Sequence, residues 1–241
     1  SIGKIAALVG VCPGFVGNRI LAQRQREANK LILEGALPWD IDDALFDFGF
    51  PMGPFAMSDL AGLDIGWNKE TSRGETIREK LCENDRFGQK SGKGFYIYDE
   101  NRNKSSDPEV EELIINFAQE QQIKRRSINK EEIIERCLYP MINEGFKILE
   151  EGMAIRASDI DIIWINGYGW PVYEGGPMFY GNLIGFEKIL ECLYIKFSIK
   201  IFFLFLEIAI LIFFNSFNFK TAGFSTITFW FFNNKKFNIL K

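Results

Sequence analysis

The sequence predicts a mainly α-helical fold made of two related helical units. Helical periodicity runs over residues 18–34, 108–121 and 130–151, where apolar residues return every three or four positions. A series of landmarks also occurs twice along the chain in the same order, which indicates a repeated structural unit. We therefore expect two copies of one helical unit that pack as a pseudo-symmetric pair.

The first unit is predicted to occupy residues 1–103. Residues 5–11 are apolar and partly β-branched, which predicts a short buried strand. Pro13-Gly14 ends this strand, because a proline followed by a glycine favours a turn. The helix that follows, residues 18–34, is expected to stop at Gly35.

Two shorter helices are predicted next. Pro38-Trp39-Asp40 opens the first of them with Asp40 as its N-cap, and Gly49-Phe50-Pro51 ends it. A second short helix begins after Gly53-Pro54 and includes Met57 and Leu60.

The rest of the first unit is more polar. Residues 69–80 are predicted to form a charged helix, and residues 86–98 a glycine-rich loop that ends in a short extended piece. Residues 99–108 are polar and end in Ser-Ser-Asp-Pro, which is typical of a linker.

The second unit is predicted to occupy residues 104–185 and to be truncated. It contains the helices predicted at 108–121 and 130–151. The paired landmarks are Arg19 and Arg136, Glu34-Gly35 and Glu151-Gly152, residues 40–42 and 159–161, residues 49–51 and 169–171, and Gly53-Pro54 and Gly176-Pro177.

Composition excludes several classes of function. The net charge of −4 does not suit a protein that neutralises nucleic-acid phosphates. The chain has no histidine, which removes the commonest general base near neutral pH and the Ser-His-Asp and Cys-His mechanisms. Its four cysteines lie far apart, so we expect reduced thiols and neither a metal site nor a disulfide framework. The chain begins with Ser1 and shows no secretory signal, and we expect that it begins inside a longer protein.

The glycine-rich segments do not predict a nucleotide site. Neither 92–94 nor 167–169 continues to the third glycine of a dinucleotide fingerprint, and 88–94 lacks the first glycine of a P-loop. We therefore expect these glycines to form turns and this chain alone to bind no cofactor.

The paired carboxylates at 40–43 and 159–161 occur in both units ahead of apolar helices. Capping explains them better than acid–base catalysis does. Ser158-x-x-Asp161 fits a capping box, in which the serine hydroxyl accepts a hydrogen bond from the backbone at Asp161.

Several distinctive sequence motifs lie within residues 5–185. Pro-Gly-Phe-x-x-Asn-Arg at 13–19 follows an apolar segment, Ala-Leu-Phe-Asp-Phe-Gly-Phe-Pro-Met-Gly fills 44–53, and Gly-x-Lys-x-Gly-x-Gly-Phe-Tyr fills 88–96. Together with residues 150–178, they resemble the C-terminal domain of 3-hydroxyacyl-CoA dehydrogenases, as found in multifunctional enzymes of fatty-acid β-oxidation of the peroxisomal bifunctional type. The resemblance implies helical units like the C-terminal domains of 6-phosphogluconate dehydrogenase.

The resemblance also implies an activity and its site. In the family a preceding Rossmann domain binds NAD and supplies a His-Glu pair, while the helical part contacts the acyl-CoA substrate and forms the dimer in the short enzymes. It places Asn18 at the active site as a supporting catalytic residue and substrate contact, although local rules alone make Asn18 a helix N-cap. Asn166 is implied as a second substrate-binding residue, with a turn between glycines as the alternative. Because this sequence lacks the NAD domain and its histidine, we expect no activity from this chain alone.

Residues 186–241 read differently from the rest. They hold 14 of the 24 phenylalanines, no proline and only one glycine, Gly223. Residues 193–214 are long enough to span a bilayer but contain Lys196, Lys200 and Glu207, so a membrane anchor and a packed helix both stay open. The interpretation we favour is translated non-coding sequence, because Phe, Ile, Lys, Asn and Leu are what A/T-rich codons encode.

Two hypotheses about function follow. The chain is either the helical part of an NAD-dependent 3-hydroxyacyl-CoA dehydrogenase, or a non-catalytic dimerisation module or membrane-tethered remnant. The resemblance points to the peroxisome, with the mitochondrion and cytoplasm as alternatives. The C-terminus Asn-Ile-Leu-Lys is not a Ser-Lys-Leu signal.

Overall fold

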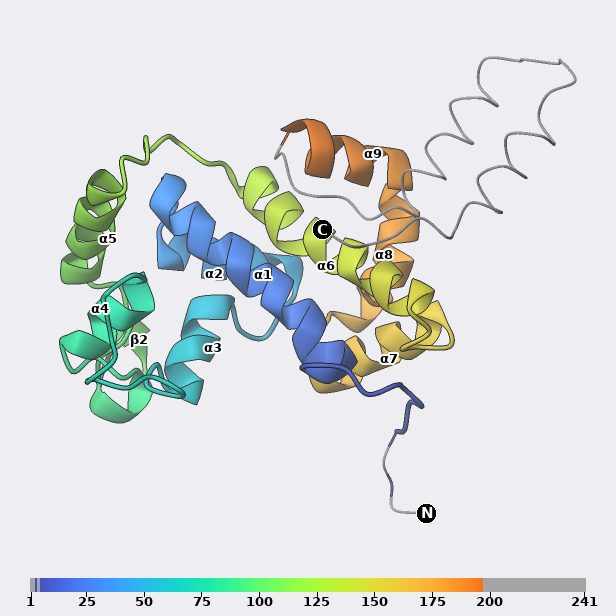
Figure 1. Ribbon diagram of the computed structural model, residues 1–241, viewed down its shortest axis with the longest axis horizontal. Helices are drawn as coiled ribbons and strands as arrows, with labels where there is room; N and C mark the ends of the chain where they lie inside the picture. The colour runs from blue at the N-terminus through green and yellow to red at the C-terminus, as the bar shows by residue number, and fades with distance from the viewer. Residues whose placement is uncertain (1–2, 4, 197–241) are drawn as a thin grey trace, which may run out of the picture.

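The computed structural model describes residues 3 and 5–196, and this part of the chain is mainly α-helical, as predicted (Figure 1). Elements of the first half are α1 (Phe15–Glu34), α2 (Pro38–Phe48), α3 (Pro54–Ala61), α4 (Ile77–Glu83), β1 (Ile97–Tyr98), β2 (Lys104–Ser105) and α5 (Pro108–Glu120). Those of the second half are α6 (Lys130–Glu150), α7 (Ala157–Gly167), α8 (Pro177–Ile184) and α9 (Phe186–Leu190), followed by a short π-helix at Glu191–Lys196. The strands β1 and β2 form a small antiparallel hairpin.

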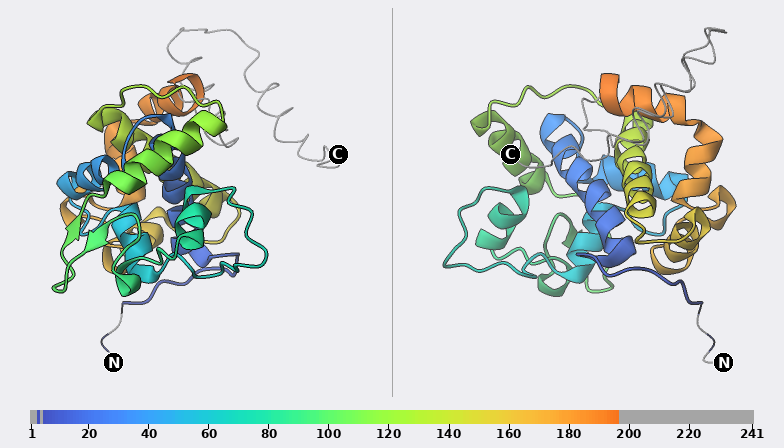
Figure 2. Two further views of the ribbon diagram at one scale, coloured as in Figure 1. Left: turned by 90° about the vertical axis from the view of Figure 1, so that its left-hand side faces the viewer. Right: turned by 45° about the vertical axis from the view of Figure 1, so that its right-hand side comes forward.

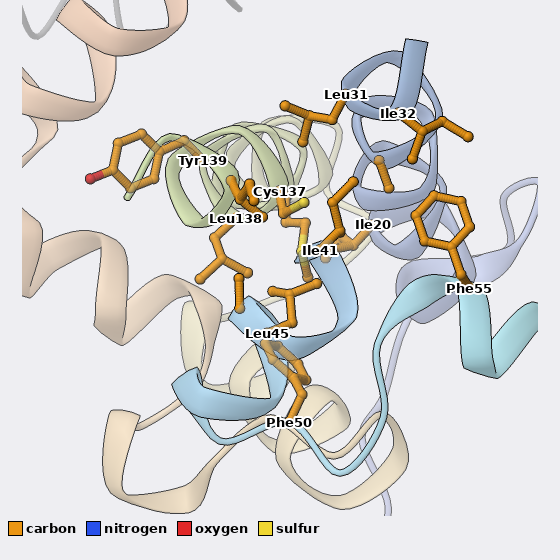
Figure 3. Packing of buried hydrophobic residues seen from close by; sticks show 14 of the residues in the cluster. Ile20, Leu31, Ile32, Ile41, Leu45, Phe50, Phe55, Cys137, Leu138 and Tyr139 are labelled. Atoms are coloured by element: carbon orange, nitrogen blue, oxygen red, sulfur yellow. The ribbon is translucent and has the colours of Figure 1, made fainter. Parts of the chain in front are cut away.

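Helices α1 and α6 lie side by side through the centre of the molecule (Figures 1 and 2). Ile20 and Leu31 of α1 and Leu138 of α6 are fully buried in one hydrophobic cluster. Ile41 and Leu45 of α2 complete this part of the core, and Figure 3 shows their side chains converging. One buried cluster thus includes residues of both predicted units.

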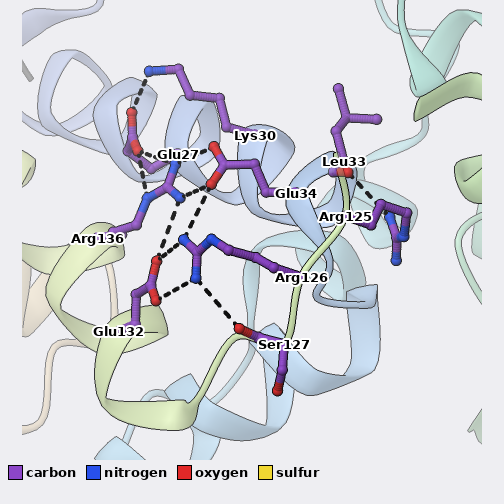
Figure 4. Close-up of polar contacts among 9 residues, drawn as sticks. All are labelled: Glu27, Lys30, Leu33, Glu34, Arg125, Arg126, Ser127, Glu132 and Arg136. Carbon is purple, nitrogen blue, oxygen red and sulfur yellow. Dashed lines mark hydrogen bonds and ion pairs between the residues drawn. The ribbon is translucent and has the colours of Figure 1, made fainter. Parts of the chain in front are cut away.

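The predicted repeat appears as reciprocal ion pairs between α1 and α6. Arg19 binds Glu144 and Glu151 with N–O distances of 2.6 Å each, and Arg136 binds Glu27 at 3.0 Å and also Glu34. Each arginine near the start of one long helix therefore contacts two carboxylates on the other helix or at its C-cap. Figure 4 shows the Arg136 half of this arrangement.

The carboxylates after each long helix also serve equivalent purposes. Asp42 of α2 accepts hydrogen bonds from the backbone N–H groups of Phe55 and Ala56 at 3.0 and 2.8 Å, at the start of α3. Asp161 of α7 accepts one from Met178 at 2.7 Å, at the start of α8. In both units a buried aspartate thus satisfies amides that a helix leaves unpaired at its N-terminus. These contacts support the structural interpretation of the paired carboxylates.

Two capping assignments made from the sequence are wrong in detail. Leu37, and not Asp40, is the N-cap of α2, while Asp40 is the third helical residue and accepts a hydrogen bond from the Leu37 amide at 2.9 Å. Helix α7 likewise begins after Arg156, and Asp159 accepts from the Arg156 amide at 3.2 Å. The capping box predicted for Ser158 is therefore wrong, because the helix begins one residue before that serine.

Among the described residues, one predicted element is absent and another is shortened. Residues 5–11 form no strand, because their only ladder contact is the bridge between Val9 and Ala154. Residues 69–71 form a turn and residues 72–76 have no regular secondary structure, since this segment lacks an apolar face and Gly74 has a φ of 62°. Helix α4 begins only at Ile77, where the Thr76 side chain caps it.

Packing continues beyond residue 185. Ile189 and Leu193 are fully buried in the main hydrophobic cluster, so the start of the phenylalanine-rich segment belongs to the core. The rest of that segment, residues 197–241, and with it most of the span considered as a membrane anchor, lies outside the described residues. Among the helices that the structure describes, none combines the length and apolar character needed to span a membrane.

Candidate functional site

Asn18 lies in the first turn of α1, and its side chain is exposed. It is not the N-cap: Gly14 holds that position in a left-handed conformation with a φ of 76°. The helix starts before Asn18 because Phe15 donates a backbone hydrogen bond to Cys12 at 2.9 Å, which closes the Pro13-Gly14 turn. The Asn18 amide is therefore free of the capping role that local rules predict for it.

The side chain of Tyr168 crosses from the second unit to Asn18. Its hydroxyl donates a hydrogen bond to Asn18 Oδ1 at 2.7 Å. The Asn18 Nδ2 group makes no hydrogen bond with any residue that the structure describes. The pair thus presents an amide donor at the place where α1 meets α7.

The Tyr168 ring is held on two sides. It stacks on Trp164, one turn earlier in α7, with 4.7 Å between ring centroids and an interplanar angle of 28°. On the other side it lies against Gly17, where an added Cβ atom would stand 2.2 Å from the ring. A glycine at position 17 is therefore required for the tyrosine to reach Asn18.

Asn166 also lies at the end of α7 and is exposed. Its Nδ2 group donates to the Ile162 backbone oxygen at 2.9 Å, one turn back in the same helix. No contact joins it to Asn18, and the residue that does contact Asn18 is Tyr168, two positions further on. Sequence reasoning missed Tyr168 because it read residues 167–169 only as a turn. The large ring between two glycines was the available signal.

The repeat offers an internal comparison for this site. The ion-paired arginines make Glu135 of α6 the counterpart of Asn18, and the glycines after α2 and α7 make Phe48 the counterpart of Tyr168. Glu135 is buried, and Phe48 packs edge-on against Trp170 and Tyr180 with centroid distances of 5.7 and 5.2 Å. The exposed polar pair therefore occurs at only one of the two equivalent places.

The electrostatics of the site suit binding and not proton transfer. Burial raises the pKa of Tyr168, so its hydroxyl keeps its proton at neutral pH. The hydrogen bond to Glu151 raises the pKa of the neighbouring Arg19, whose charge two carboxylates balance. An amide and a protonated phenol can hold an oxygen atom of a ligand, but they supply no general base. Among the described residues, no group of three or more His, Cys, Asp or Glu side chains could bind a metal ion.

Several known proteins are similar to this chain in sequence and in fold. Residues 14–98 match the family model described as 3-hydroxyacyl-CoA dehydrogenase, C-terminal domain. The chain is 44% identical over 212 residues to the peroxisomal bifunctional enzyme of Danio rerio, covering 79% of this chain and 30% of that protein. It is 37% identical over 198 residues to the fatty acid oxidation complex subunit alpha of Vibrio cholerae, covering 78% of this chain and 27% of that protein.

A solved structure agrees with these matches. The dehydrogenase part of multifunctional enzyme 1 from C. elegans superposes with a TM-score of 0.62 and 37% identity, covering 79% of this chain and 45% of that chain. The chain thus spans about 30% or less of the two relatives named above and under half of that structure. The matched motifs, the identity to these relatives and the common fold show that this chain belongs to the family of 3-hydroxyacyl-CoA dehydrogenase C-terminal domains.

Proposed function

We propose that this chain is the acyl-CoA-contacting part of an NAD-dependent 3-hydroxyacyl-CoA dehydrogenase of fatty-acid β-oxidation. That enzyme oxidises a 3-hydroxyacyl-CoA to the 3-ketoacyl-CoA. The observation that carries the proposal is the exposed Asn18 amide, held by Tyr168 at the junction of α1 and α7. An amide N–H aimed at an oxygen of the substrate can stabilise charge that develops there during the reaction. Asn166 is proposed as a second substrate contact at the end of the same helix, α7.

The described residues do not fit NAD. A dinucleotide fold needs a parallel strand, a glycine-rich loop and a helix, whereas the sheet that the structure describes here is a two-stranded antiparallel hairpin. The proposal assigns NAD and the catalytic base to a separate domain of the same enzyme.

An apolar strip beside the site is a suitable surface for that domain. Ile5, Leu8 and Val11 are 68, 76 and 84% exposed, although their sequence predicts a buried strand. The bridge between Val9 and Ala154 places this segment next to Ile155, which is also largely exposed. The segment leaves the helical body at the same end of α1 as Asn18 (Figure 1). Docking there would bring the NAD-binding domain next to the Asn18 amide.

The cellular location and the oligomeric state are proposed from the relatives. The match to peroxisomal bifunctional enzymes supports a peroxisomal location, and a homodimer is proposed from the family alone. The second candidate, a non-catalytic interaction module, draws on the same apolar strip. The two candidates differ in whether this chain changes the rate of a dehydrogenase.

Reconstitution tests the proposal. The chain is mixed with a separately purified NAD-binding domain of a 3-hydroxyacyl-CoA dehydrogenase, and NADH oxidation is followed with acetoacetyl-CoA. We expect a rate well above that of the isolated domain. Replacing Asn18 with alanine is expected to lower kcat/KM by about 10²–10³ fold, because it removes one transition-state donor. Asn29→Ala, an exposed asparagine further along α1, serves as the matched control and should leave the rate unchanged.

The two candidate functions differ in whether binding of the NAD-binding domain raises its dehydrogenase rate. If the chain binds the NAD-binding domain in gel filtration but the mixture turns over no faster than the domain alone, the interaction module is correct and the dehydrogenase proposal is wrong.

A further inference from the structure

An exposed asparagine side chain has two faces that a ligand could meet. Its Oδ1 accepts hydrogen bonds and its Nδ2 donates them, and rotation about the last side-chain bond exchanges the two. A site that must donate to a substrate oxygen needs one of these orientations to dominate. In this structure the Tyr168 hydroxyl engages Oδ1 at 2.7 Å, which leaves Nδ2 for the ligand.

We expect the fold to tolerate loss of the Tyr168 hydroxyl. At the equivalent place in the first unit, Phe48 packs an aromatic ring without a hydroxyl against Trp170 and Tyr180. The ring of Tyr168 is stacked on Trp164 instead of packed edge-on, and a phenylalanine ring could make the same stacking contact. What the tyrosine adds is the oxygen atom that contacts Asn18.

The surrounding residues favour this single contact. Gly17 makes room for the ring, and an alanine there would place its Cβ atom 2.2 Å from Tyr168. The hydrogen bond joins the first turn of α1 to the residue that ends α7, two segments that are 150 positions apart in the sequence. It therefore also links the two units at the site itself.

We propose that Tyr168 is a positioning residue, which holds the Asn18 amide with Nδ2 turned outward to donate to an oxygen atom of the acyl-CoA substrate. This inference rests on the proposed function of Asn18 as a substrate contact. Tyr168 itself acts through Asn18 and does not touch the substrate. The hydroxyl proton stays on Tyr168 because it is a donor in this bond and burial raises its pKa.

The first test uses the full 241-residue chain without a ligand. The side-chain amide signals of Asn18 are assigned by NMR from their loss in Asn18→Ala. In Tyr168→Phe we expect these signals to shift and their protons to exchange faster with water. Tyr173→Phe is the matched control, because its hydroxyl bonds the Phe48 backbone oxygen at 3.1 Å and not Asn18. Unchanged Asn18 signals in Tyr168→Phe would overturn the inference.

The second test measures coupling in the reconstituted enzyme. Tyr168→Phe is expected to lower kcat/KM about three- to tenfold, the size expected for one neutral hydrogen bond. The same substitution made on the Asn18→Ala background should have no further effect, because Tyr168 has no amide left to position. Gly17→Ala, which displaces the ring, should reproduce the loss while Asn18 is present.

The outcomes distinguish this inference from the proposed function. If Asn18→Ala itself leaves the rate unchanged, the proposed function of Asn18 is wrong. If Asn18→Ala lowers the rate but Tyr168→Phe does not, or if the two losses add fully, only the positioning role is wrong. An unchanged melting temperature for Tyr168→Phe is expected, and a fall of several degrees would show that the hydroxyl serves the fold.

Discussion

Arg24 carries a charged side chain into the centre of the core. The residue is 1% exposed, and its Nε and Nη1 atoms have no hydrogen-bond partner among the described residues. Its guanidinium lies 5.0 Å from the ring centroid of Phe50 and 6.0 Å from that of Trp164. Burial lowers the pKa of Arg24, which reflects the cost of keeping the charge away from water. The two rings recover part of that cost, since cation–π contacts contribute about 2 kcal/mol when desolvated.

A methionine at position 24 should stabilise the protein. Arg24→Met keeps most of the side-chain volume and removes the buried charge, so we expect the free energy of unfolding to rise by about 1–4 kcal/mol. Arg24→Ala should lower it, because that change also leaves a cavity. Urea denaturation followed by circular dichroism measures both. A methionine variant that is less stable than the original chain would show that the guanidinium stabilises the core.

The stability contributed by Asp59 should depend on pH. Burial raises the pKa of Asp59 from 3.8 to about 6, although the amides of Phe95 and Tyr96 and the Tyr98 hydroxyl donate hydrogen bonds to it. The folded state therefore binds this proton more tightly than the unfolded state does. The contribution of Asp59 falls as the pH rises from about 4 to about 6.

Asp59→Asn isolates this effect because asparagine does not titrate. The difference in unfolding free energy between the original chain and the variant should shrink as the pH rises through that range, and stay constant above about 7. Asp161, whose pKa is also raised to about 6, is present in both proteins and cancels. Urea midpoints over a pH series provide the measurement, and a difference that grows with pH would contradict the assignment.

Single residues of the site were only partly predictable. The family motif points to Asn18 as a candidate site residue, whereas local rules alone make it a cap. Its partner Tyr168 was not identified, since the two residues are 150 positions apart and only packing brings them together. A contact across the fold leaves no local pattern in one sequence. The glycine that makes it possible, Gly17, gains its meaning only from the ring beside it.

At the scale of elements, the helices with the strongest apolar periodicity are those that the sequence predicts most accurately. The long helices α1, α5 and α6 were predicted to within three residues at each end, because each has an apolar stripe and clear end signals. The charged helix expected at 69–80 has no stripe to bury, and only its last residues are helical. The strand expected at 5–11 has the composition of a strand, but pairing depends on a neighbouring strand that the sequence pattern cannot specify.

The ion pairs of Arg19 and those of Arg136, which both join α1 to α6, should differ in strength. Arg136 has a side chain only 6% exposed and contacts Glu27, which is 4% exposed, whereas Arg19 is 16% exposed and one of its partners is largely open to solvent. Removing one partner of a buried pair leaves an unpaired charge. We therefore expect Arg136→Ala to cost about 3–5 kcal/mol and Arg19→Ala about 1–2 kcal/mol.

Chemical denaturation of both variants at neutral pH measures the difference. Arg73→Ala is the control, because that side chain is 82% exposed and its ion pair with Glu75 is 3.8 Å long. If both variants lose the same unfolding free energy, the ion pairs of the two arginines contribute equally to stability. The difference in their burial would then have no effect on their strength.

At the scale of the whole molecule, the repeat was predictable and the dependence between its two copies was not. The landmarks recur because each unit needs a similar N-terminal cap and an aspartate that anchors the start of a short helix, α3 in the first unit and α8 in the second. What the sequence does not reveal is that α1 packs on α6, so that the apolar face of each unit is covered by the other. The domain boundaries predicted at 103 and 185 stay predictions. Packing of Ile189 and Leu193 into the shared core argues that the second unit extends beyond residue 185.

Because each unit covers the apolar face of the other, we predict that half of the chain cannot fold by itself. A fragment of residues 1–122 keeps α1 to α5 but loses α6, which exposes Ile20, Ala28 and Leu31, all fully buried in the whole chain. Exposure of a fully buried leucine or isoleucine side chain costs about 1.5–3 kcal/mol and that of an alanine less, so these three residues together remove much of the stability of a small domain. We expect the fragment to show reduced helicity and no cooperative thermal transition by circular dichroism, and to regain both when mixed with residues 123–241. A fragment that unfolds cooperatively alone would show instead that the first unit is an independent domain, and that the contact between α1 and α6 joins two preformed bodies.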